Sequence, residues 1–305
     1  MARNTLEAWI PEEYDSAVIQ RVQSSSAVEK VASHTPMKSD TKHIPRSAGV
    51  GVDYIPKGGA YGEDVSANDE VLLTARKLGK AIRIAEEDID DSLADVLGQK
   101  GIDWATSYGK FFDNATLGVT AAENGTTVPF TSVYKALATA NAATGYTAND
   151  NITQTAALGA VTYDLLSATL ADLEAGDFFD ASNTVVIAHP SFRSGLRGVK
   201  DTAGNPIFVQ GLAGTPDTIF GAQIKWSTGA RTSALPSSAP GGNPIAVFLN
   251  PDFLRVGDRS NPESMFIDGD TGVGALTDEA ILKYRARKGF VVGNEKAFAI
   301  LERMP

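Results

Sequence analysis

The chain has 305 residues, of which 43% are hydrophobic and 21% are charged, a balance typical of a globular protein with a sizeable core. It contains no cysteine, which excludes disulfides, thiolate metal sites and cysteine nucleophiles. The net charge is −10, and because residues 1–60 hold equal numbers of basic and acidic side chains, the whole excess lies in residues 61–305. An acidic body of this kind disfavours tight binding to nucleic acid phosphates.

The start of the chain has no apolar core of the sort that a secretory signal needs. No apolar run in the sequence approaches the roughly 20 residues that span a bilayer. We therefore expect a protein that is made in the cytoplasm and has no membrane contact.

Residues 1–36 are predicted to form an extended N-terminal arm. Val18, Ile19 and Val22 follow Pro11 at helical spacing, which predicts a short amphipathic helix. Such a helix has too little apolar surface to be stable by itself, so it is expected to lie against something larger. We expect Trp9 and the three aliphatic residues to make the contacts of this arm.

Residues 37–73 are rich in glycine and proline, with short β-type fragments and too few apolar residues for a core. Lys57-Gly58-Gly59 is a strong turn signal near the middle. The pattern predicts a long β-hairpin that projects from the body. Because an isolated hairpin is at best marginally stable in water, its side chains are expected to contact another subunit. The candidates for that contact are Ile44, Tyr54, Ile55, Lys57 and Tyr61.

Residues 71–84 alternate apolar and polar side chains and are predicted to form a strand. Apolar residues then recur at three- and four-residue steps from Ile89 to Ala115, with acids at the start and Gly118 at the end. This pattern predicts one helix of about 30 residues, or about 45 Å at 1.5 Å per residue. A helix of that length suggests a spine.

The remaining chain is predicted to contain an α/β layered block and closing strands. Residues 122–155 lack a clear period and are expected to be a surface excursion. Residues 156–275 alternate helical stripes with buried strands. Within that block, residues 229–243 are expected to be a flexible loop. Residues 279–301 alternate as strands and are expected to return to the spine helix.

The sequence offers no convergent set of catalytic residues. His34, His43 and His189 are far apart, and His189 is expected to cap or hydrogen-bond rather than to catalyse. Asp268, Asp270 and Glu279 match part of a calcium-loop template, but valine stands at the position where that template needs glycine. We expect an acidic surface loop there, and we expect neither a cofactor nor a metal.

The order of these segments resembles the major capsid proteins of tailed bacteriophages, which have the Hong Kong 97-type fold. The match runs from about residue 27 to 301 and is carried by several motifs in order. They include SAVEKVASHTPMKSDTKHIPR, LTARKLGKAIRIAEEDIDDSLADV, VVIAHPSFRSGLRGVKDTAGNPIF, GTPDTIFGAQIKWS, AVFLNPDFLRVGDR and ILKYRARKGFVVGNEKAFAIL.

The resemblance implies an α+β fold with four parts. These are an N-terminal arm at 1–36, an extended loop at 37–73, a peripheral domain with the spine helix at 74–155 and 276–305, and an axial α/β domain at 156–275. It implies a subunit without enzymatic activity that binds copies of itself into pentamers and hexamers. The resulting icosahedral head of the virion would enclose double-stranded DNA without binding it specifically.

The resemblance also raises the question of other partners and of covalent bonds. Separate scaffolding, portal and decoration proteins are possible partners. Some relatives cross-link a loop lysine to an asparagine of a neighbour, and Lys57 is placed for that role. No matching acceptor or catalytic glutamate is evident, so a solvated or ion-paired Lys57 is the preferred interpretation.

Two other readings of the sequence stay open. An encapsulin-type nanocompartment shell has the same fold and would hold cargo enzymes in place of DNA. An ordinary α/β hydrolase-like enzyme would need a nucleophile and base that the sequence does not supply.

Overall fold

The computed structural model describes residues 25–47, 52–63, 69–90, 95–157, 160–201, 203–206, 208–209, 216–267 and 278–305. The chain divides into two compact units. The described part of the smaller unit comes from Lys80–Ala105 and Ser264–Tyr284, and the larger unit comprises Ser24–Gly79, Thr106–Glu263 and Arg285–Pro305.

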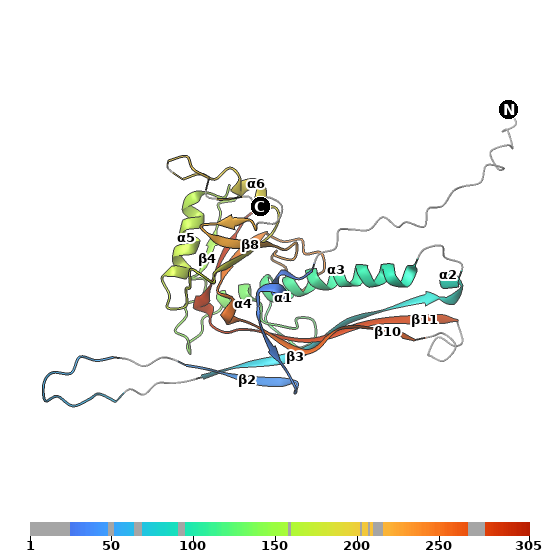
Figure 1. Ribbon diagram of the computed structural model, residues 1–305, viewed down its shortest axis with the longest axis horizontal. Helices are drawn as coiled ribbons and strands as arrows, with labels where there is room; N and C mark the ends of the chain where they lie inside the picture. The colour runs from blue at the N-terminus through green and yellow to red at the C-terminus, as the bar shows by residue number, and fades with distance from the viewer. Residues whose placement is uncertain are drawn as a thin grey trace. The chain divides into compact units, whose positions relative to one another are not determined.

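The described chain contains both helices and strands (Figure 1). The helices are α1 Ala27–Val31, α2 Glu86–Asp90, α3 Val96–Leu117, α4 Val133–Leu137, α5 Tyr163–Glu174 and α6 Phe192–Leu196, with short 3-10 turns at Pro251–Phe253 and Glu295–Ala297. The strands are β1 Ser33–Pro36, β2 Thr41–Arg46, β3 Asp69–Ala85, β4 Ile152–Gln154, β5 Val185–Ala188, β6 Phe208–Val209, β7 Thr218–Ile219, β8 Ala222–Trp226, β9 Ile245–Leu249, β10 Leu254–Ile267, β11 Glu279–Val292 and β12 Phe298–Glu302.

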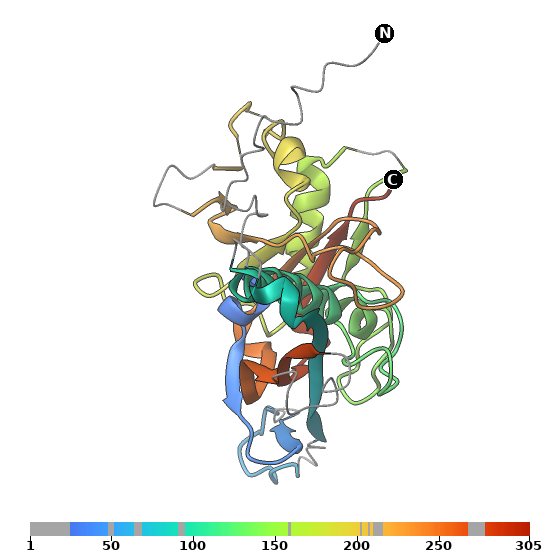
Figure 2. The same cartoon turned by 90° about the vertical axis from the view of Figure 1, so that its right-hand side faces the viewer.

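A seven-stranded mixed sheet forms the centre of the larger unit, in the order β4-β12-β9-β5-β8-β7-β6. Strands β9 and β12 are buried at every position, as expected for strands that are covered on both faces. They pair antiparallel, with Phe298 opposite Leu249, and β12 pairs parallel with β4 on its other edge. Helix α5 packs against this sheet, and the turned view shows it beside the red strand β12 (Figure 2).

The position of β12 corrects one sequence expectation. We expected the last strand to return to the long helix, but it pairs with β9 and β4 inside the seven-stranded sheet. The physical reason lies in its sequence, FAILE, in which four consecutive apolar residues precede the final glutamate. Such a run fits a central strand better than a strand at an edge, because a central strand is covered on both faces.

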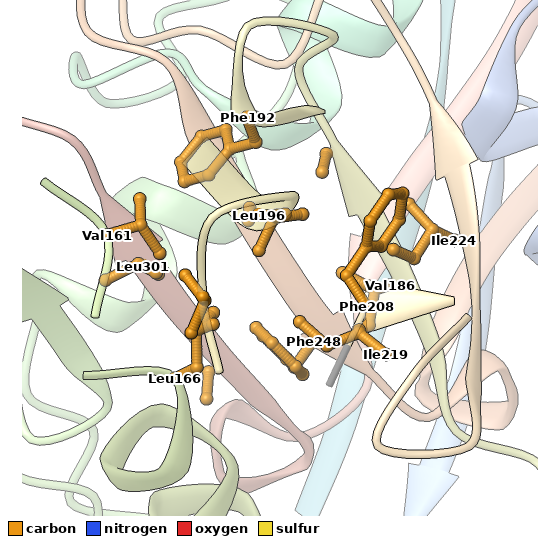
Figure 3. Close-up of a cluster of buried hydrophobic side chains, with 14 of the residues drawn as sticks. Val161, Leu166, Val186, Phe192, Leu196, Phe208, Ile219, Ile224, Phe248 and Leu301 are labelled. Carbon is orange, nitrogen blue, oxygen red and sulfur yellow. The ribbon is translucent and has the colours of Figure 1, made fainter. Parts of the chain in front are cut away.

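The core of the larger unit lies where α5 and α6 meet this sheet. Side chains from both helices converge on the strands in Figure 3. Leu166 of α5, Phe192 of α6 and Phe248 of β9 are each at most 1% exposed. The hydroxyl of Thr162 accepts a hydrogen bond from the Leu165 amide and so caps the start of α5.

A second sheet has the order β1-β10-β11-β3-β2. Strand β1 pairs parallel with β10 from Ser33 opposite Arg255, and β2 pairs antiparallel with β3 from Thr41 opposite Thr74 to Arg46 opposite Asp69. The predicted strand at 71–84 is confirmed as part of β3. The β2–β3 pair is the base of the predicted hairpin.

The smaller unit contains the start of the predicted spine. The helix expected near 86–118 is described as α2 and the 22-residue α3, while residues 91–94 lie outside the described chain. Trp104 of α3 stacks on Tyr284 with ring centroids 5.0 Å apart. Arg83 is 3.1 Å from Glu279, so the residue considered as a calcium ligand forms an ion pair. Asp268 and Asp270 lie outside the described residues.

Two loops expected to be loose are packed. In the segment 122–155, Phe130, Val133 and Leu137 are at most 1% exposed, so this segment contributes to the core. In the segment 229–243, the amide of Ser233 donates to the Gly118 carbonyl at 3.0 Å, and Asn114 of α3 also bonds to this loop. Both expectations were wrong because these loops are held by contacts that are distant in sequence.

Candidate functional site

The extended loop is described between residues 52 and 63, beyond the paired ends of β2 and β3 (Figure 1). Its predicted tip is confirmed as a turn, because the Gly59 amide donates to the Pro56 carbonyl at 2.8 Å. Gly58 has φ 84°, a conformation that side chains other than glycine rarely adopt. Residues 52–63 contain no strand. The expected hairpin is therefore paired at its base, in β2 and β3, but not along residues 52–63.

The loop carries the most exposed large apolar side chains of the described chain. Val52, Tyr54 and Tyr61 are 96%, 91% and 86% exposed. Lys57 is also exposed, and Ile55 is half-buried. The other large apolar residues that are exposed in the described chain lie between 43% and 52%. Aromatic side chains left in water in this way are typical of a surface that is completed by a partner.

The base of the loop is held by Arg46. Its guanidinium forms an ion pair with Asp69 directly across the β2–β3 pair. It also donates to the Gly293 carbonyl at 3.1 Å and lies 4.0 Å from Glu295. The hydrogen bond from Arg46 holds the pKa of Asp69 below its ordinary value. Ile44, the fifth residue predicted for this surface, is half-buried in β2.

The described end of the predicted arm is residues 25–36, which we call the arm root. It is bound to the larger unit, since Ser26, Ala27 and Val28 are all buried. This part of the arm therefore does not extend away from the body. Trp9, Val18, Ile19 and Val22, the predicted arm contacts, lie outside the described residues.

Asp113 of α3 holds the start of the arm root. Its carboxylate accepts hydrogen bonds from the Ser26 hydroxyl at 2.5 Å and from the amides of Ala27 and Val28 at 2.9 and 3.1 Å. The Ser227 hydroxyl donates to it at 2.5 Å. Burial raises the pKa of Asp113, and the four donors act in the opposite direction. Asp113 was not predicted as a functional residue, although a carboxylate among apolar helix residues was a signal that could have identified it.

A charged cluster holds the other end of the arm root. Lys288 of β11 lies 2.6 Å from Asp258 of β10 and 3.5 Å from Glu29 of α1. The Tyr108 hydroxyl donates to Glu29 at 2.9 Å, and burial next to that carboxylate raises the pKa of Tyr108. His34 of β1 lies 2.6 Å from Asp258. Burial raises the pKa of Asp258, but hydrogen bonds from Lys288 and His34 lower it below its ordinary value.

His189 has a hydrogen-bonding role, as expected. Its Nδ1 is 2.8 Å from the Ser191 hydroxyl, and Arg231 donates to its Nε2 at 3.1 Å. Burial and the positive charge of Arg231 lower the pKa of His189 to about 4. A serine next to a histidine is one requirement of a nucleophilic site, but the arginine here opposes protonation of the base.

The described residues contain neither a cluster of metal-binding side chains nor a membrane-spanning helix. There, no group of three or more histidine, aspartate or glutamate side chains is arranged to hold a metal ion. None of the helices in this part of the chain is both long and apolar enough to cross a membrane.

Comparison with known proteins gives one family and one fold. The model of the phage capsid family matches residues 7–302. A chain of Mycobacterium phage Bobi superposes with a TM-score of 0.75 at 17% identity, over 98% of this chain and 97% of that chain. A chain of Mycobacterium phage Adephagia gives 0.73 at 17% identity, over 100% and 98%. The capsid of a native GTA particle computed with C5 symmetry gives 0.72 at 14% identity, over 99% of each chain. None of the curated proteins matches this sequence.

These findings confirm the fold expected from the sequence. The structural matches cover almost the whole chain, which supports the Hong Kong 97-type α+β fold. The family match covers the arm root, the loop base and both sheets together. The chain therefore belongs to the phage capsid family, and it is a major capsid protein, a structural component of the virion that self-assembles into an icosahedral shell.

Proposed function

We propose that the subunits assemble as pentamers and hexamers of a phage head that encloses double-stranded DNA, and that the extended loop is their principal clasp. The observation that carries this proposal is the exposure of Val52, Tyr54 and Tyr61 on a segment fixed at its base by Arg46. Apolar and aromatic area of this kind is stabilised when a neighbouring copy removes it from water. A head-to-tail contact repeated around a ring closes when the rotation per subunit allows it.

The four-part division of the chain belongs to the same proposal. The arm at 1–36 and the loop at 37–73 make contacts between subunits. The segments 74–155 and 276–305 form the peripheral domain, and 156–275 form the axial domain at the centre of each ring. Because β12 pairs with β9, the two domains share a sheet at this point.

The subunit acts without catalysis in this proposal, and it is made in the cytoplasm of a host bacterium. The low pKa of His189 beside Arg231 supports a structural role for the one serine–histidine contact described above. The net charge of −10 supports enclosure of DNA without specific binding. Scaffolding, portal and decoration proteins remain candidate partners.

Removal of the loop tests the proposal. Residues 52–63 are replaced by a short Gly-Ser linker, which leaves the Arg46–Asp69 pair in place. We expect a soluble, folded chain by circular dichroism that forms no shells by electron microscopy. Normal shells from this variant would contradict the role of the loop as the clasp.

A matched control and a content assay make the test specific. Leu235→Ser removes a side chain that is 52% exposed elsewhere on the larger unit, and shells are expected to form normally. Nuclease-protected DNA in particles from infected cells is expected. Particles that instead hold cargo enzymes and no DNA would indicate an encapsulin-type compartment.

The covalent state of Lys57 is tested separately. Because this side chain is exposed at the turn, we expect it to be solvated in the subunit. Boiled particles should then migrate as single chains on a denaturing gel. A ladder of covalent multimers that disappears in Lys57→Arg would overturn this expectation.

A further inference from the structure

The ring of His34 lies between two hydrogen-bond acceptors. Its Nδ1 is 2.6 Å from a carboxylate oxygen of Asp258, and its Nε2 is 2.7 Å from the backbone carbonyl oxygen of Glu29. A carbonyl oxygen can accept but not donate, and the same holds for an ionised carboxylate. A neutral imidazole has a single N–H and can satisfy one of the two. The protonated ring has two N–H groups and satisfies both.

The charges around His34 lead to the same assignment. Lys288 has a side chain only 5% exposed and contacts both Asp258 and Glu29. One ammonium group between two carboxylates leaves one negative charge uncompensated. A positive His34 balances the cluster, and charges that are partly removed from water are costly unless they are balanced.

We infer that His34 is a proton-controlled latch that fastens the arm root, residues 25–36, to strand β10. The protonated ring bridges β10 and α1 through Asp258 and Glu29, while β1 itself has only four residues paired with β10. When the ring loses its proton, one of the two hydrogen bonds is lost. Asp113 still holds the first residues of the root, so the weakened part is the stretch from Glu29 to Pro36.

The groups that face the latch come from each element packed around it. Asp258 on β10 and Glu29 on α1 favour the proton, whereas Lys288 on β11 opposes it. Tyr108 on α3 donates to Glu29, and Arg255 on β10 donates to Ser33, the residue before the latch, at 2.9 Å. Burial and Lys288 lower the pKa of His34, but the hydrogen bonds to Glu29 and Asp258 and the charge of Asp258 raise it by more. The pKa of His34 is therefore raised overall.

The direction of the pH effect follows from this balance. Because the pKa is higher in the docked root than in an undocked one, docking is favoured at low pH. The free energy that protonation of His34 adds to docking is fully present below the ordinary histidine pKa of about 6.5. It is lost as the pH rises through the higher pKa of His34 in the docked root. A consequence for assembly rests on the proposed role of the arm, because the latch lies in the arm root.

The first test reads the protonation state in the unaltered protein. The chain has three histidines, so ¹⁵N-histidine labelling of the full-length protein in its particles gives few signals for solid-state NMR. Across a pH series we expect His34 to keep two protonated nitrogens to a higher pH than an ordinary histidine, whose pKa is about 6.5, and His189, whose Nε2 accepts from Arg231, to be neutral at about pH 7. Assignment uses His34→Gln and His189→Asn. A His34 ring that loses its second proton at or below about pH 6.5 would overturn the inference.

The second test reads the latch itself through hydrogen–deuterium exchange of the amides in residues 29–35, between about pH 6 and about pH 9. After correction for intrinsic chemistry, exchange should rise by up to about tenfold for each unit by which docking raises the pKa. His34→Gln should remove this pH-dependent part. His43→Gln is the matched control, because His43 has one carboxylate partner, Glu70, at 2.8 Å and is 61% exposed.

The control is expected to keep the wild-type profile. A profile that is flat in the wild type, or equal in His34→Gln and the wild type, would contradict the latch. Neither readout requires the arm to bind a neighbour. A result that contradicts the His34 latch would therefore leave the proposed role of the loop untouched, and the reverse also holds.

Discussion

The arm root was predicted to be part of an extended arm and the loop to be a hairpin that projects from the body, and their surroundings in the structure differ. The root is held by Asp113 at one end and by the Lys288 cluster at the other. The loop is held at its base by Arg46, and beyond that base Tyr54 and Tyr61 remain in water. A weakly apolar, extended sequence can therefore be either buried against the subunit or left exposed to water, as the proposed clasp is.

The difference between the two segments lies in the polar groups that the body supplies. The root finds a buried carboxylate for its first amides and a balanced set of charges for His34. The described loop offers aromatic rings that the described part of the subunit leaves exposed. In the proposed function, exposed aromatic area, more than extension of the chain, is therefore what marks the loop as a contact between subunits.

The largest effect is expected from the loop aromatics. In Tyr54→Ser/Tyr61→Ser, each subunit loses two rings of the kind that dominate interfaces, at about 2 kcal/mol each. The concentration needed for shell assembly should rise by more than about tenfold, as measured by sedimentation. The unfolding of the unassembled chain should be unchanged, because both rings are already exposed. A large loss of stability would show that they pack within the subunit.

Asp113→Ala removes the anchor of the arm root. Two amides and two hydroxyls then lose their buried acceptor, and the free energy of unfolding should fall by about 2–4 kcal/mol. Urea denaturation of the full-length chain measures this change. Glu174→Ala, an exposed acid at the end of α5, is the control and should stay within about 0.5 kcal/mol of the wild type. Equal stability of the two variants would mean that the root is not anchored by Asp113.

Arg46→Ala loosens the base of the loop. The variant loses the ion pair with Asp69 and the hydrogen bond to Gly293. We expect faster cleavage by a protease within residues 52–63 and slower shell assembly, with the seven-stranded sheet unaffected. Arg83→Ala, which breaks the ion pair with Glu279 in the smaller unit, is the matched control. Cleavage at the same rate in both variants would argue against Arg46 as the anchor.

The smallest effect concerns His189, which contrasts with His34. Its pKa is lowered to about 4, so an unfolded chain binds a proton near pH 6.5 that the folded chain does not. Stability should therefore fall as the pH is lowered from about 6.5 toward 4, by roughly 1–2 kcal/mol once the partial exposure of the ring is discounted. His189→Asn should lack this share of the acid sensitivity in urea denaturation, and His43→Gln should retain it. The same acid profile in both variants would contradict the assignment.

Much of the fold could be predicted where the local pattern agrees with the tertiary structure. The apolar run at 245–249, the helical stripe ending at Leu173 and the turn at Lys57-Gly58 all have the form expected from spacing and turn residues. The pattern did not predict the place of residues 298–302, because an apolar run does not indicate which strand it pairs with. It failed again at 122–155, where isolated apolar residues such as Phe130 have no period but fill a core.

The sequence by itself determined the family, the acidic character and the position of the loop, since these depend on composition and on the order of local motifs. The tertiary structure decided which charges meet. Asp113 lies more than 80 positions from the amides that it holds, and Asp258 lies 224 positions from His34. Hydrogen bonds and ion pairs act over a few ångströms in space and carry no signature along the chain. For that reason the difference between the docked root and the exposed loop became visible only in the folded subunit.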